Sequence, residues 1–121
     1  MPIEASTQRI RVEIDGVTVA DSERPMFLHE PGLPVRYYLP PSDIRMDLLV
    51  PTDTSTTCHW KGQARYWSAA INGKVHKDIA WGYDHPLVEA EAIAGLVSFY
   101  NEKVDVYVDE VLQGRRVTKF A

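Results

Sequence analysis

The chain has 121 residues, of which 45% are apolar and 25% charged, with a formal net charge of −4. This length and composition predict one globular domain over residues 1–121 and exclude a two-domain enzyme, a disordered chain and a collagenous one. The stretch MPIEASTQR lacks the basic and apolar regions typical of a signal sequence, and the sequence has no basic arm and no apolar run of about 18 residues. We therefore expect a cytoplasmic protein that binds neither nucleic acid nor membranes.

The N-terminal half alternates short β-favouring stretches with turn residues. Asp15-Gly16 suits a tight type I′ turn, and Pro31-Gly32 separates two apolar stretches. We expect strands over residues 9–14, 17–19, 26–28 and 35–39. One helical turn is expected within 42–47, and the polar run 52–57 is expected to be a loop.

The C-terminal half begins with a stronger signal, because Asn72-Gly73 is typical of a two-residue hairpin turn. Strands are expected over about 64–71, 74–80, 96–100 and 104–108. Pro86 and the Ala/Glu-rich stretch 87–94 predict one short helix, and residues 115–119 a loosely held tail. This pattern predicts a mainly β domain, either a small barrel or two packed sheets with about one short helix.

Positive charge gathers in one part of the chain. Residues 58–79 contain four basic side chains, Lys61, Arg65, Lys74 and Lys77, but one acidic side chain. One interpretation is that these side chains give an anionic ligand a local positive field. The alternative is that they are ordinary solvated charges of a hairpin.

The segment Cys58-His59-Trp60-Lys61-Gly62 combines a thiol with titratable neighbours. One interpretation is a cysteine-dependent enzyme: Cys58 as nucleophile or redox thiol, activated by Lys61, with His59, His76 or His85 as base. The alternative is that Cys58 is a small buried apolar residue. Metal binding is not expected, because one Cys and four scattered His lack the spacing of ligand pairs, and no cofactor is predicted.

Aromatic residues cluster beside predicted strand ends, at Tyr37-Tyr38, Tyr66-Trp67 and Trp81-Gly82-Tyr83. Alternation along a strand sends neighbouring side chains to opposite faces, so we expect half of these rings in the core and half lining a cleft. Our first hypothesis is that this cleft binds an anionic small molecule, a nucleotide or sugar phosphate. The predicted binding residues are Arg36, Tyr37, Lys61, Tyr66, Trp67, Trp81 and Tyr83, with Arg65 as a further cation. A third hypothesis is an interaction module or homodimer that uses an open strand edge.

Most of the chain resembles the small, mostly bacterial proteins called domain of unknown function 427, which also carry the label nucleotidyltransferase-like. The matching stretches are 11–12 through 19–22, 35–40 with 43–44, 58–66, 80–83 with Pro86, 93–100 and 104–109. The resemblance implies a two-sheet β-tent, an architecture also seen in methionine sulfoxide reductases and small zinc chaperones. Their zinc does not carry over, because this chain lacks paired cysteines, and His59 stands where the family motif usually has Pro.

Overall fold

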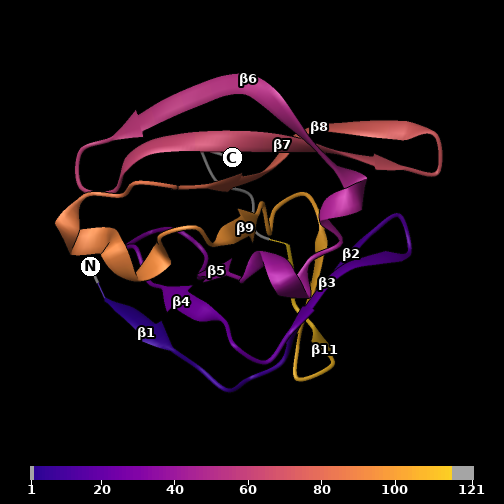
Figure 1. Ribbon diagram of the computed structural model, residues 1–121. Helices are drawn as coiled ribbons and strands as arrows, with labels where there is room; N and C mark the ends of the chain where they lie inside the picture. Colours follow the sequence, from indigo (N-terminus) through magenta and orange to yellow (C-terminus); the bar gives the residue numbers. More distant parts are fainter. Residues whose placement is uncertain (1, 116–121) are drawn as a thin grey trace.

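Three antiparallel sheets make up the computed structural model, which describes residues 2–115 (Figure 1). The first sheet has the order β1-β4-β5, with strands Ile3–Ala5, Met26–Leu28 and Arg36–Tyr38. The second has the order β11-β10-β2-β3, with strands Val111–Leu112, Asp105–Val108, Ile10–Ile14 and Val17–Ser22. The third has the order β6-β7-β8-β9, with strands Leu49–Cys58, Gly62–Ile71, Lys74–Gly82 and Val97–Phe99.

The mainly β class is confirmed, but the chain builds three sheets rather than the predicted two, and none of them closes into a barrel within residues 2–115. Both predicted hairpins are present. Asp15-Gly16 has φ of 49° and 79°, and Asn72-Gly73 has φ of 51° and 75°, as a type I′ turn requires. Residues 116–119 of the predicted tail lie outside the described residues.

The prediction of a loop over 52–57 is wrong, because these residues belong to β6 at the edge of the third sheet. Ser, Thr and Asp favour turns by bonding nearby backbone, and Thr52 Oγ1 does accept from the Thr54 N–H, but two of the threonines also bond another strand. Thr52 and Thr54 donate hydrogen bonds to Asp78 of β8 at 2.7 and 2.6 Å. A bulge between Pro51 and Ser55 accommodates the proline, which has no N–H to donate.

The helical segments are 3₁₀ turns, η1 (Pro41–Asp43), η2 (Met46–Leu48) and η3 (Val88–Ile93). The predicted helix over 87–94 is therefore found as η3, which is irregular because Ala90 has non-helical φ and ψ of −116° and 17°. Among residues 2–115, a helix that is long and apolar enough to cross a membrane does not occur.

Side chains gather into two buried clusters. One, the apolar core, includes Trp67, Ala80, Phe99 and the inward residues of β2 and β10. The other, the aromatic cluster, is built around Tyr38, Tyr66, Trp81 and Tyr83, with Trp60 and Tyr100 packed on it. Figure 1 shows β6, β7 and β8 as one layer, with β4 and β5 across from it. The aromatic cluster takes its rings from both.

Candidate functional site

Strand register sorts the aromatic side chains. Tyr66 pairs with Trp81, and Trp81 pairs with Ser98, so these three side chains lie in a row on one face of the third sheet. Tyr38, from β5 of the first sheet, is fully buried against the same cluster and accepts a hydrogen bond from Trp81 Nε1 at 3.0 Å. Tyr66, Trp81 and Tyr83 are 5–8% exposed, so the rings form a packed cluster rather than an open cleft.

Lys61 stands at the outer end of the aromatic cluster, in the turn between β6 and β7. Its Nζ donates a hydrogen bond to Glu30 Oε1 at 2.9 Å. The same Nζ lies 5.5 Å from the Trp60 ring centroid and 5.4 Å from that of Tyr83, within cation–π range. Only 10% of the Lys61 side chain and 15% of the Glu30 side chain are exposed. Burial of an ion pair contributes little stability by itself.

Arg36 forms a second buried ion pair, at the inner end of the cluster. Its two terminal nitrogens donate to the Glu102 carboxylate at 2.6 and 3.0 Å, and one also donates to Asn101 Oδ1 at 2.9 Å. The guanidinium lies 5.3 Å from the Trp81 ring centroid and 5.7 Å from that of Tyr100. These bonds use three of the five guanidinium donors, which favours a structural role for Arg36.

Three phenol groups of the cluster, those of Tyr38, Tyr83 and Tyr100, have raised pKa values. Burial raises the pKa of Tyr83 well above its ordinary value, and charge on Tyr38, Cys58, Tyr66 or Glu30 raises it further. Burial likewise raises the pKa of Tyr38 and of Tyr100. Their O–H groups therefore keep their protons at neutral pH and can donate hydrogen bonds. Tyr66 already shares a 2.8 Å hydrogen bond with Thr56 of β6.

The predicted catalytic residues Cys58, His59 and Lys61 lie at one turn, and among residues 2–115 no hydrogen bond joins Cys58 to a histidine. Cys58 is half-buried at the end of β6 and pairs with Gly62 across the turn. His59 is exposed. His76, one alternative base, lies with its Nε2 2.9 Å from Asp15 Oδ2 in the β2–β3 turn. His85, the other, is exposed.

Two predicted binding residues face the apolar core instead. Tyr37 packs edge-on against Phe27 with ring centroids 4.9 Å apart. Trp67 belongs to the apolar core because it follows Tyr66 directly and so points to the opposite face. Arg36, Lys61, Tyr66, Trp81 and Tyr83 do come together, at the aromatic cluster.

Sequence reasoning missed the residues that complete the site. They are Glu30, Tyr38, Trp60, Tyr100 and Glu102. Tyr38 and Tyr100 were open to prediction, because each is an aromatic residue within or next to a predicted strand. The two glutamates carry no local signal, since each reaches a cation far away in the sequence.

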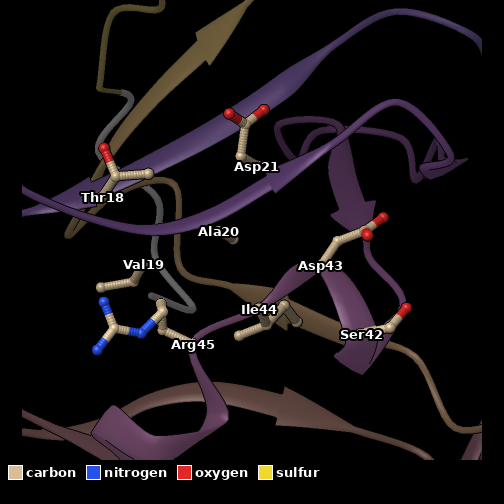
Figure 2. A pocket seen from close by; sticks show the side chains of 8 residues that line it. All are labelled: Thr18, Val19, Ala20, Asp21, Ser42, Asp43, Ile44 and Arg45. Carbon is tan, nitrogen blue, oxygen red and sulfur yellow. The ribbon is translucent and has the colours of Figure 1, made fainter.

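A separate hollow of about 360 Å³ lies between β3 and the segment 42–45 (Figure 2). Figure 2 shows Thr18 and Asp21 extending from β3, and Ser42, Asp43 and Arg45 from the facing segment. Its charged groups already have protein partners: Asp21 accepts from Arg9, Asp43 accepts from Ser22, and Arg45 donates to Asp47. We therefore place the candidate site at the aromatic cluster.

Within residues 2–115, no three His, Cys, Asp or Glu side chains come together as a group suited to a metal ion.

Comparison with known proteins identifies the family. No curated protein was found to match the chain. A family model described as Domain of unknown function (DUF427) matches residues 2–110, and the chain belongs to this family.

Proposed function

We propose that the domain binds a small anionic molecule, a nucleotide or sugar phosphate, at the Lys61 end of the aromatic cluster. The observation that carries the proposal is the Lys61 ammonium, buried between the Trp60 and Tyr83 rings with one carboxylate partner. An ammonium has three donors, and Glu30 is the one hydrogen-bond partner of this group among residues 2–115.

The donors around Lys61 suit an anion. The Tyr83 ring lies 5.4 Å from the ammonium, and its phenol can donate a hydrogen bond. Tyr38 and Tyr66 lie close enough to influence the pKa of Tyr83. Glu30 already balances the charge of Lys61, so the favoured ligand is a monoester with one phosphate rather than a polyphosphate. Half-buried Trp60 offers its ring to a base or sugar at the outer edge.

Opposite effects at Lys61 and Glu30 test this proposal. With AMP and ribose 5-phosphate as probes, Lys61→Met is expected to raise Kd by about tenfold or more, because a charge-assisted hydrogen bond is lost. Glu30→Gln is expected to lower Kd, because a carboxylate no longer competes with the ligand. Binding is measured by calorimetry and by tryptophan fluorescence.

Exposed Lys74 supplies the matched control, and Lys74→Met is expected to bind both probes like the parent protein. Circular dichroism confirms that each variant folds. If Glu30→Gln weakens binding as much as Lys61→Met does, or if the parent protein binds neither probe, the ion pair is structural and the proposal is wrong.

A cysteine-dependent activity is the second candidate, favoured by the half-buried Cys58 at the same turn as Lys61. We expect iodoacetamide to alkylate Cys58 in the native protein, more slowly than in urea, and AMP to slow the reaction. Mass spectrometry measures the rates, with the Cys58→Ser protein as a blank. A thiol that reacts only after denaturation would remove this candidate.

Three further expectations from the sequence stay predictions. They are the cytoplasmic location, the bacterial origin and the nucleotidyltransferase-like character that the family label implies.

A further inference from the structure

A second polar hollow, of about 240 Å³, lies near the β6–β7 turn of the third sheet. It is lined by Ser55, Gln63, Ala64, Arg65, Asp84 and His85. These residues come from β6, from β7 and from the segment that follows β8. Four of them, Ser55, Gln63, Arg65 and His85, are exposed side chains with hydrogen-bond donors.

This hollow is distinct from the aromatic cluster. Arg65 pairs with Ser55 on one side and with Gly82 on the other, whereas its neighbour Tyr66 pairs with Trp81. Successive residues of a strand point to opposite faces, so the backbone of β7 separates Arg65 from the tyrosine hydroxyls. Arg65 therefore cannot serve the site proposed above, although the sequence grouped it with Lys61.

Contacts within the protein hold the Arg65 guanidinium in place before any ligand binds. Its Cζ lies 4.6 Å from the centroid of the Trp67 ring, which supports one flat side of the group. One hydrogen bond is formed, from Arg65 Nη1 to Asp84 Oδ2 at 3.3 Å, near the upper limit for such a bond. The remaining guanidinium donors have no partner among residues 2–115.

Two further groups add donors at the same hollow. Ser55 Oγ accepts a hydrogen bond from Gln63 Nε2 at 2.8 Å, which leaves the serine O–H free to donate elsewhere. His85 has no hydrogen-bond or ion-pair partner among residues 2–115, and its ring is exposed. The hollow thus combines a planar fork of N–H groups with a hydroxyl and an imidazole, a set suited to tetrahedral oxyanions.

We propose that this hollow binds the phosphate group of a small phosphate monoester, independently of the site at Lys61. The phosphate oxygens take the place of Asp84 on the Arg65 fork and accept the hydroxyl of Ser55. Asp84 competes for the same donors, so binding is expected to be weak.

Methyl phosphate is the probe, because it has no ring for the aromatic cluster to contact. In a ¹⁵N NMR titration, we expect saturable shifts at the amides of Gln63, Arg65 and Asp84. Arg65→Met is expected to raise Kd at least tenfold, Arg65→Lys to raise it less, and Asp84→Asn to lower it. Arg24→Met, at another exposed arginine with a carboxylate partner, is expected to change nothing.

The Lys61→Met protein separates this proposal from the first one, because methyl phosphate should still shift the Gln63, Arg65 and Asp84 amides there. Shifts that survive Arg65→Met unchanged, or equal shifts with sodium chloride at the same ionic strength, would overturn the proposal. So would methyl phosphate shifts confined to Lys61 and Tyr83.

Discussion

Neutralising Glu102 is expected to lower the free energy of unfolding by about 3–5 kcal/mol, because Glu102→Leu leaves the Arg36 charge buried without its main partner. Both side chains are about 95% buried, at 6% and 5% exposure. The expected fall in Tm is roughly 10–20 °C for a domain of this size. Urea unfolding and calorimetry measure both quantities.

The double variant Arg36→Met/Glu102→Leu distinguishes the pair from its single members. Replacing a whole buried ion pair with apolar side chains is often close to neutral, so the double variant should recover most of the lost stability. Asp47→Asn, which removes one member of the exposed Arg45–Asp47 pair, should leave Tm unchanged. A Glu102→Leu protein as stable as the parent would show that Arg36 finds other partners.

Gly82→Ala is expected to destabilise the domain by about 3 kcal/mol, the upper part of the range for overpacked cores. A Cβ at this position would lie 2.5 Å from the carbonyl oxygen of Leu96 and 3.5 Å from the Trp67 ring. The contact is with backbone, so it is relieved only by moving β8 away from β9. Thermal and urea unfolding measure the loss.

Gly114→Ala is the matched control, because a Cβ there meets no atom within 4 Å and the backbone is not left-handed. Its expected effect on Tm is negligible. A Gly82→Ala protein that unfolds at the parent temperature would mean that the β8–β9 spacing adjusts freely.

Period-2 alternation and turn chemistry predicted most strands of the fold, since these signals are local. Both type I′ turns lie where Asp15-Gly16 and Asn72-Gly73 predicted them. The polar strand β6 escaped prediction because Thr52 and Thr54 bond Asp78, a partner that only the folded sheet provides. Local composition alone favours a loop there.

The candidate site was harder to predict than the fold, because β7 carries buried aromatic side chains on both of its faces. Tyr66 and Trp67 are equally aromatic and almost equally buried, yet register sends the first to the aromatic cluster and the second to the apolar core. Their different surroundings depend on pairing with Trp81 and Ala80, which adjacency in sequence does not reveal.

The pairing of β2 with β10 determines when the second sheet can form during synthesis of the chain. Arg9 and Asp109 meet across this junction although they are 100 residues apart in the chain. Until residues 105–108 leave the ribosome, one backbone edge of β2 has no strand to bond, whereas β6 to β9 form from one continuous stretch of chain. The second sheet is therefore the last to close during synthesis, and a nascent chain that stalls before residue 105 presents an open, aggregation-prone edge.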